Sequence, residues 1–304
     1  MEQKGSPAEM IHSSPVIPPE WKGLDLSGLK GTLLVIGAPN VGKSTFARYL
    51  YQQLAARQQR VAFLDGDPGQ TTLSAPTTMT LALGRSGDHD FPPRGRMWQS
   101  FVGAVTPAGH MLQVVIGAAR LVRAAQRAGV EIIVYDTTGL VNPFRGGVYL
   151  KLAKINLLRP TVVFAIQSAR ELECLLQPLR RSKRVELIEL SISPGARTRD
   201  ATTRQAHRAA QFSRYFTNSL PLTIHWPRLA VLPAPRFVAN QLVALEDEEG
   251  LMLGLGIVLE SDQNAKKVVL YTPVTSIDRV DTLHLGDVVL DPHTFQDARL
   301  PKRR

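Results

Sequence analysis

The stretch that decides the fold reads Gly37-Ala38-Pro39-Asn40-Val41-Gly42-Lys43-Ser44-Thr45. An apolar run precedes it at residues 32–36, and residues 46–51 follow with apolar positions that suit a helix. Strand, glycine-rich turn and helix start therefore succeed one another, in the pattern G-x-x-x-x-G-K-[ST]. A chance match in a chain of this length is expected about one time in a hundred. We interpret the stretch as a binding site for a nucleoside triphosphate.

Phosphate binding explains the residue types in this loop. Gly37 and Gly42 let the backbone bend until successive N–H groups point at the phosphates. The positive end of the following helix favours the same negative charge. Lys43 is expected to reach the β- and γ-phosphates, and Ser44 is expected to bind magnesium. The predicted cofactors are therefore ATP, or another nucleoside triphosphate, and Mg²⁺.

The composition is that of a globular protein. With 304 residues, 44% of them hydrophobic, the chain can bury the core of one large domain or two smaller ones. A single cysteine, Cys174, excludes an internal disulfide and fits a reducing compartment. We find no charge-free apolar run near the roughly 18 residues that cross a membrane, and no signal-peptide pattern. We expect a cytoplasmic protein without a membrane partner, disordered over residues 1–16.

Positive charge is concentrated in one segment. The chain carries 36 basic and 26 acidic residues, a net charge of +10. Nine basic and three acidic residues between Arg180 and Arg214 contribute +6 of this charge. Such a segment favours a polyanionic partner such as nucleic acid. The alternative is a solvated helix face without a partner.

Two further predicted strands end in polar residues. Residues 61–64 lead into Asp65 and Asp67, at a position where a P-loop fold holds magnesium and the attacking group. The alternative for these aspartates is a turn or helix cap. Residues 131–135 lead into Asp136-Thr137-Thr138-Gly139-Leu140, which could hold the nucleotide or the acceptor, or form an ordinary polar turn.

The remaining pattern completes an α/β prediction. We expect core strands at residues 101–105, 161–166 and 185–190, a helix at 111–128, and a long connection over 71–100. Arg204 and Arg208, four residues apart, share one face of a helix, and Arg199, five residues earlier, lies somewhat off that face. Such a helix could close over the phosphates as a lid. From residue 228 onward, short β-type runs alternate with turns.

These elements predict a P-loop NTPase core with a mostly parallel sheet, a helical arginine lid and a small C-terminal β-rich domain. The expected boundaries are 17–225 for the core, with the lid at about 193–216, and 226–304 for the C-terminal domain.

Four motifs together resemble the polynucleotide 5′-hydroxyl kinase family, P-loop RNA and DNA 5′-kinases related to the tRNA-splicing and rRNA-processing kinases. The P-loop is the first. The second is Asp67-Pro68-Gly69-Gln70, 24 positions after Lys43, and the third is the "clasp" Thr137-Thr138-Gly139. The fourth is the set of lid arginines, Arg199, Arg204 and Arg208. The chain looks like a stand-alone, prokaryotic-type member.

The resemblance implies transfer of the γ-phosphate of ATP, or another NTP, to the free 5′-OH end of RNA or DNA. Asp67 would activate the hydroxyl and sit near the metal with Ser44, and Gln70 would assist there. Thr137, Thr138 and Gly139 would clamp around Lys43 and the acceptor. The lid arginines Arg199, Arg204 and Arg208 would stabilise the transferring phosphoryl group. No obligate protein partner is evident.

Two departures from the family pattern stand out. Family clasps often carry Trp where this chain has Leu140, which puts the acceptor preference in question. Eukaryotic members carry a β-sandwich domain ahead of the P-loop, whereas only a short segment precedes it here, so accessory functions of that domain are not transferred. Two other functions stay open: a nucleotide-binding switch or scaffold without kinase activity, and a small-molecule P-loop kinase.

Overall fold

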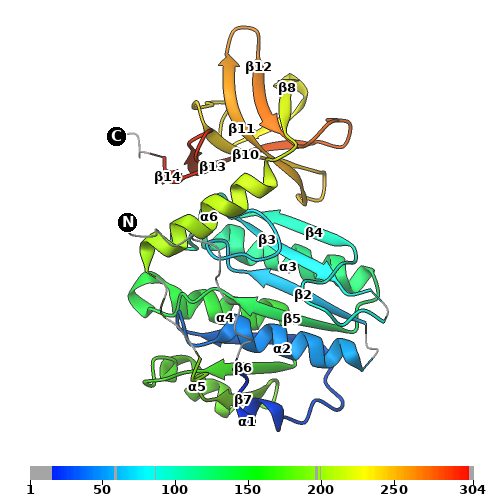
Figure 1. The fold of residues 1–304 in the computed structure, drawn as a ribbon, viewed down its shortest axis with the longest axis vertical. Coiled ribbons are helices and arrows are strands. Elements are labelled where there is room, and N and C mark those ends of the chain that lie inside the picture. The colour runs from blue at the N-terminus through cyan, green and yellow to red at the C-terminus, as the bar shows by residue number, and fades with distance from the viewer. Residues whose placement is uncertain (1–15, 58–59, 86, 196–197, 199, 301–304) are drawn as a thin grey trace, which may run out of the picture.

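A computed structural model describes residues 16–57, 60–85, 87–195, 198 and 200–300. Two β-sheets lie at opposite ends of an elongated molecule, and the helix α6 (Ala201–Tyr215) runs between them (Figure 1). Residues 1–15 of the segment expected to be disordered lie outside the described residues. The predicted lid residue Arg199 also lies outside them. None of the helices that the structure describes is long and apolar enough to span a bilayer.

The first sheet has the order β4-β3-β2-β5-β1-β6-β7. The strands from β2 to β7 along this order are parallel, and β3 and β4 are added antiparallel at one edge. In chain order the strands are β1 (Gly31–Gly37), β2 (Val61–Gly66), β3 (Thr78–Leu83), β4 (Met97–Phe101), β5 (Ile132–Thr137), β6 (Val162–Ile166) and β7 (Glu186–Leu190). This is the mostly parallel α/β sheet that the sequence predicts.

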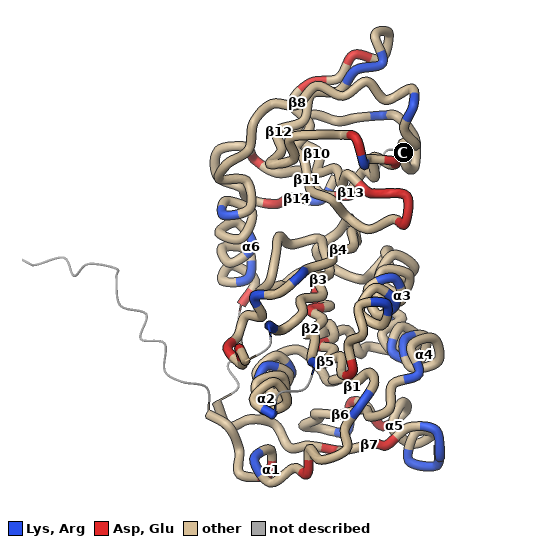
Figure 2. The backbone as a smooth tube through the Cα atoms, turned by 90° about the vertical axis from the view of Figure 1, so that its right-hand side faces the viewer, with Lys and Arg blue, Asp and Glu red and all other residues tan. Residues whose placement is uncertain are grey.

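Helices cover both faces of this sheet, which explains why its central strands are continuously apolar. Leu33 and Val35 of β1 pack with α1 (Pro19–Lys22) and α2 (Lys43–Ala56). Leu34 and Ile36 face the opposite side. There they pack with the helices α3 (Met111–Arg127), α4 (Gly147–Leu158) and α5 (Glu173–Arg180) (Figures 1 and 2).

Two sequence-based expectations for this region are wrong. Residues 71–100 are not an unstructured connection, because they contain β3 and most of β4. The strand expected at 101–105 ends at Phe101, and Gly103 takes a φ of +82°. The strand β3 does not show the apolar pattern of a buried strand, because Thr78 and Thr80 are polar residues that suggest a loop. Both are nevertheless fully buried in β3. Pairing with β2 supplies the stabilisation that local periodicity does not reveal.

The second sheet has the order β14-β13-β10-β11-β12-β8, with β9 paired to β13. Its strands are β8 (Leu220–His225), β9 (Ala230–Leu232), β10 (Gln241–Glu246), β11 (Met252–Asp262), β12 (Lys267–Thr272), β13 (Thr282–Leu290) and β14 (Asp297–Arg299). The C-terminal part is β-rich, as predicted. The second sheet nevertheless begins before the expected boundary at residue 226, because β8 pairs with β12 along its whole length.

The helix α6 is anchored to the second sheet at its C-terminal end. Phe212 and Phe216 are fully buried in a core with Leu255 and Leu290. The Tyr215 hydroxyl accepts a hydrogen bond of 2.8 Å from the backbone N–H of Leu255. The N-terminal half of α6 extends from this anchor toward the first sheet (Figure 1).

Candidate active site

The phosphate-binding loop lies between the end of β1 and the start of α2. Asn40 and Gly42 have φ angles of +63° and +96°, in the left-handed region that favours glycine. A Cβ atom on Gly37 would lie 2.5 Å from the carbonyl oxygen of Ile166, so only glycine fits beside β6. The loop therefore delivers its backbone to the N-terminus of α2, a site suited to phosphate.

Lys43 is buried at the base of this loop. Its side chain is 7% exposed, and Nζ donates a 2.6 Å hydrogen bond to the carbonyl oxygen of Ala38. Burial lowers the pKa of Lys43, while the carboxylates of Asp136 and Asp67 oppose this by favouring the charged form. Asp136 of β5 and Asp67, just after β2, thus both act on the amino group of Lys43.

Asp136 belongs to the site, although it is not among the site residues predicted from the sequence. The strand next to β1 is β5, and β2 with its aspartates lies one strand further away. Asp136 pairs in register with Val35 on one side and Asp65 on the other. A usable signal was present, because four consecutive apolar residues (residues 132–135) followed by an aspartate are typical of the metal-binding strand in P-loop proteins.

Asp136 has the properties of a magnesium ligand. It is 4% exposed, and its Oδ1 has no hydrogen-bond partner among the described residues. Burial and the neighbouring Asp65 raise the pKa of Asp136 to about 6, and the Ser44 hydroxyl partly offsets this rise. Across the part of the chain that the structure describes, no group of three or more His, Cys, Asp or Glu residues forms a dedicated metal cage. One or two carboxylates and a hydroxyl, completed by phosphate oxygens and water, suit Mg²⁺.

The two aspartates after β2 have different surroundings. Asp65 is 2% exposed, and its Oδ2 accepts hydrogen bonds from the Thr71 hydroxyl at 3.0 Å and the Thr72 N–H at 2.7 Å. Asp65 therefore holds the following loop in place, which is the turn role that the sequence left open. Asp67 accepts through Oδ1 from the N–H groups of Gly69 (3.0 Å) and Gln70 (3.2 Å). Its carboxylate also acts on Lys43.

The clasp residues contact the phosphate-binding loop and its strand. Thr137 donates a 2.7 Å hydrogen bond from Oγ1 to the carbonyl oxygen of Val35 in β1. The Thr138 hydroxyl accepts from the N–H of Leu140 at 3.0 Å. A Cβ atom on Gly139 would lie 2.9 Å from the nitrogen of Pro39, so this close approach requires glycine. Gly139 therefore packs against the loop, Thr137 bonds to the strand that leads into it, and Thr138 bonds within its own turn. The side-chain nitrogen of Gln70 donates to the carbonyl oxygen of Gly69, and its Oε1 is buried without a partner among the described residues.

The side chains of α6 reach three different partners. Arg204 lies 3.5 Å from the Asn40 side-chain oxygen of the phosphate-binding loop. The Nε2 atom of His207 lies 3.2 Å from the carbonyl oxygen of Thr71. His207 is not among the residues predicted from the sequence. Arg208 forms a 2.8 Å ion pair with Asp297 of the second sheet. Of the lid arginines on α6, Arg204 therefore contacts the loop, and Arg208 ties the helix to β14.

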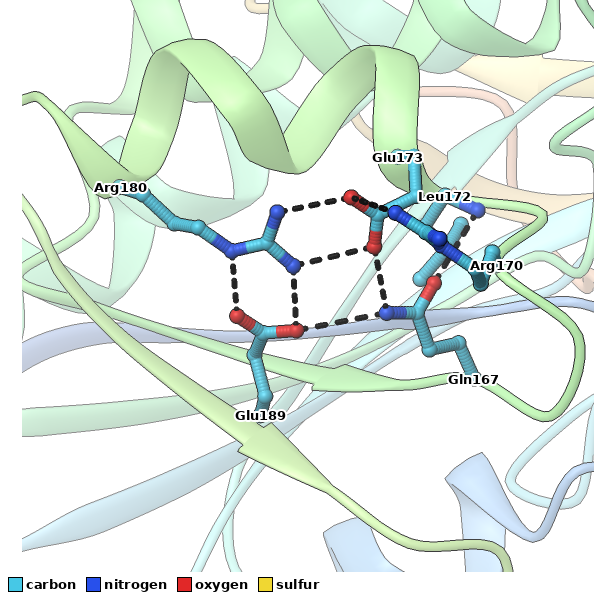
Figure 3. A network of polar contacts seen from close by, with 6 residues as sticks. All are labelled: Gln167, Arg170, Leu172, Glu173, Arg180 and Glu189. Atoms are coloured by element: carbon cyan, nitrogen blue, oxygen red, sulfur yellow. Dashed lines mark hydrogen bonds and ion pairs between the residues drawn. The ribbon is translucent and has the colours of Figure 1, made fainter.

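Part of the basic segment is neutralised by local partners. Arg180 forms ion pairs of 2.7 Å with both Glu173 and Glu189, and Gln167 completes the network (Figure 3). Other basic residues lie along α6 and α3 (Figure 2). The positive charge that this segment can present to a nucleic acid is therefore smaller than the count from the sequence.

Comparison with known proteins agrees with this geometry. The family model described as "mRNA cleavage and polyadenylation factor CLP1 P-loop" matches residues 37–218. A polyribonucleotide 5′-hydroxyl-kinase of Pyrococcus furiosus is 25% identical, over 84% of this chain and 86% of the relative. One of Methanocaldococcus jannaschii is 27% identical, over 73% and 60%.

The fold is also similar to that of a solved structure. A Clp1p–Pcf11p complex structure superimposes with a TM-score of 0.65 at 11% identity, covering 87% of this chain and 76% of that one. The P-loop α/β prediction is thereby confirmed, and so is the resemblance read from the four motifs. The chain belongs to the CLP1 P-loop family.

Proposed function

We propose that this protein is a polynucleotide 5′-hydroxyl kinase that transfers the γ-phosphoryl group of ATP, or another NTP, to the 5′-OH end of RNA or DNA. One observation carries the proposal. Asp67, Asp136 and the lid residue Arg204 converge from three separate elements on a P-loop whose lysine is buried. The archaeal relatives are named as polyribonucleotide kinases, which favours RNA as the acceptor.

Each residue has a role that follows from its position. Lys43 and the loop backbone bind the β- and γ-phosphates. Ser44 and Asp136, with Asp67 nearby, would hold Mg²⁺, which when bound neutralises charge on the phosphate oxygens. Asp67 orients the 5′-hydroxyl and accepts its proton as the new O–P bond forms and the bond to the β-phosphate oxygen breaks. Arg204 stabilises the charge on the transferring group.

An exposed aromatic ring follows the clasp closely in the sequence. Phe144, in η1 (Pro143–Arg145), is 97% exposed and follows Gly139 by five residues. Arg145 beside it is also exposed. An aromatic ring next to a cation is a common platform for bases of single-stranded nucleic acid. We infer that Phe144 supplies the stacking surface that Leu140, in place of the family Trp, does not.

The test is end-labelling with matched oligonucleotides. Protein, Mg²⁺ and γ-labelled ATP are incubated with 5′-OH RNA and DNA of one sequence, and with the 5′-phosphorylated forms as controls. Label is expected on the 5′-OH strands, more on RNA than DNA, and absent with Lys43→Met. Lys30→Met, an exposed lysine just ahead of β1, is the matched control and keeps activity.

Two results would favour the other functions. Phosphorylation of a mononucleoside far faster than of any oligonucleotide would indicate a small-molecule kinase. Tight ATP binding with no phosphorylated product from any acceptor would indicate a nucleotide-binding switch.

A further inference from the structure

Two lysines on α4 are fully buried beneath the active site. Lys151 and Lys154 each have 0% exposure, one turn apart on the same helix. Lysine is almost never fully buried without a partner, because removing its charge from water is costly. Neither residue belongs to the P-loop, the Asp67 motif, the clasp or the lid, so the roles assigned above leave both unexplained.

The two lysines differ in their partners. Lys151 donates from Nζ to the Thr137 hydroxyl at 2.7 Å and to the Thr138 carbonyl oxygen at 2.5 Å. Lys154 has no hydrogen-bond partner for Nζ among the described residues, and its Nζ lies 4.7 Å from the centre of the Tyr135 ring. Lys151 is therefore bonded to the clasp, whereas Lys154 rests on an aromatic face.

The contacts of Lys151 continue to the phosphate-binding loop. Thr137 accepts from Lys151 and donates to the Val35 carbonyl oxygen of β1, two residues before the loop begins. Two residues further on, Gly139 lies against Pro39 with no space for a Cβ atom. A path of direct contacts thus joins α4 to β5, β1 and the loop.

Because of this tight packing, the position of the clasp determines the position of the phosphate-binding loop. Because Gly139 already touches Pro39, a displacement of a few tenths of an ångström in residues 137–139 must move the loop as well. Burial and then the neighbouring Lys154 hold the pKa of Lys151 well below its usual range, and its amino group has N–H donors in either protonation state. Lys151 donates two hydrogen bonds to adjacent clasp residues and so fixes both a side chain and the backbone.

We propose that Lys151 is a positioning residue, whose side-chain amino group holds the clasp against the phosphate-binding loop and thereby sets nucleotide affinity and the rate of transfer. The effect on the rate of transfer rests on the proposed function, whereas the effect on nucleotide affinity does not. Lys151 acts through Thr137 and Thr138 rather than by touching nucleotide or acceptor.

The test compares Lys151→Met with Lys154→Met. Methionine keeps the length and apolar body of lysine and removes the N–H donors, so both variants replace a buried amino group at neighbouring sites. Lys151→Met is expected to weaken binding of a fluorescent methylanthraniloyl-ATP by about 10-fold or more, by analogy with residues that orient metal ligands. It should raise the KM for ATP and lower kcat. The kcat/KM of Lys154→Met should fall at least ten times less than that of Lys151→Met.

The KM distinguishes positioning from simple loss of stability. A variant that only unfolds in part loses active protein, so kcat per mole falls while the KM for ATP stays unchanged. Thermal unfolding monitors this directly for both variants. Equal losses for the two lysines, or an unchanged ATP affinity in a folded Lys151→Met, would overturn the proposal.

A second route covers the case in which Lys151→Met does not fold. Thr137→Val keeps the volume and removes the hydroxyl that links Lys151 to Val35, and should weaken methylanthraniloyl-ATP binding in the same direction. Where the double variant can be made, the two losses should be less than additive because they break one path. Unweakened binding in a folded Thr137→Val overturns the proposal. Nucleotide binding needs no acceptor, so failure of end-labelling would refute the proposed function and leave this test intact.

Discussion

The carboxyl edge of the first sheet and the helix α6 hold their charged residues in opposite ways. At the sheet edge Lys43, Asp65, Asp136 and Lys151 are all below 10% exposure, each on a strand or helix that pins it. Along α6, which is described throughout, Phe212 is the only buried side chain. The arginines of α6 stay partly exposed and reach the loop in one case and the second sheet in another.

This contrast separates two kinds of contribution. Buried charges on regular elements are held in position before substrate arrives, which is where electrostatic stabilisation is most effective. Partly exposed arginines are screened by salt and by water, so each depends on what it touches. The four predictions below test whether location and partner, rather than residue type, decide the size of each effect.

The largest expected effect separates two arginines one helical turn apart. Arg204→Gln should lower kcat about 10³-fold, the size found for arginines that act on a transferring phosphoryl group. Arg208→Gln should lower kcat far less and reduce the thermal stability instead, since its partner is Asp297. Steady-state end-labelling measures kcat, and thermal unfolding measures the stability of each variant. A greater loss of turnover in Arg208→Gln than in Arg204→Gln would break the comparison.

The next effect concerns the buried aspartate. Asp136→Asn should lower kcat by about 10²-fold and raise the Mg²⁺ concentration needed for half-maximal activity. Asp67→Asn should lower kcat without changing the Mg²⁺ requirement if its main role is to orient the hydroxyl. A magnesium titration of both variants separates the roles. A shift in Asp67→Asn alone would make Asp67 the metal ligand, as the sequence first suggested.

A smaller effect is expected on the acceptor side. Phe144→Ser should raise the KM for an RNA oligonucleotide about tenfold, the value of one stacked base, and leave the KM for ATP unchanged. Because the ring is 97% exposed, the melting temperature should not change. Leu220→Ser, exposed at 70% on the second sheet, is the control. An equal effect in both variants would argue against stacking at Phe144.

The smallest effect tests the surface network of Arg180. Hydrogen bonds from Arg180 and then Gln167 lower the pKa of Glu173 to about 2. A depressed carboxyl pKa stabilises the fold above the ordinary value near 4.5, and this stabilisation is lost as the pH falls towards 2. Glu173→Gln should therefore lower the Tm by about 1–2 °C at pH 7, with a difference that shrinks below pH 4.5 and in high salt. A pH-independent difference in Tm would contradict the ion-pair origin; Glu186→Gln is the exposed control.

Local pattern was enough for much of the fold and for part of the site. The phosphate-binding loop, the flanking strand and helix, and the strands at residues 61–64, 131–135 and 161–166 follow from periodicity and turn chemistry within a few residues. Neighbours in sequence set these features, and so they can be read there. The strand β3 does not follow from local pattern, because its buried threonines are tolerated only through partners in the fold: the Thr78 hydroxyl donates to the Ala75 carbonyl oxygen, and the Thr80 hydroxyl accepts from Gln99.

What the chain's sequence determined by itself is a triphosphate loop in a strand–turn–helix context and the order of motifs that marks the family. Only the tertiary structure decided that β5 lies beside β1, so that Asp136 faces Ser44, and that Lys151 is bonded to the clasp. The pairing of Arg208 with Asp297, 89 residues away, is of the same kind. Such contacts join segments distant in the chain, and no local periodicity records which distant segment will be the partner.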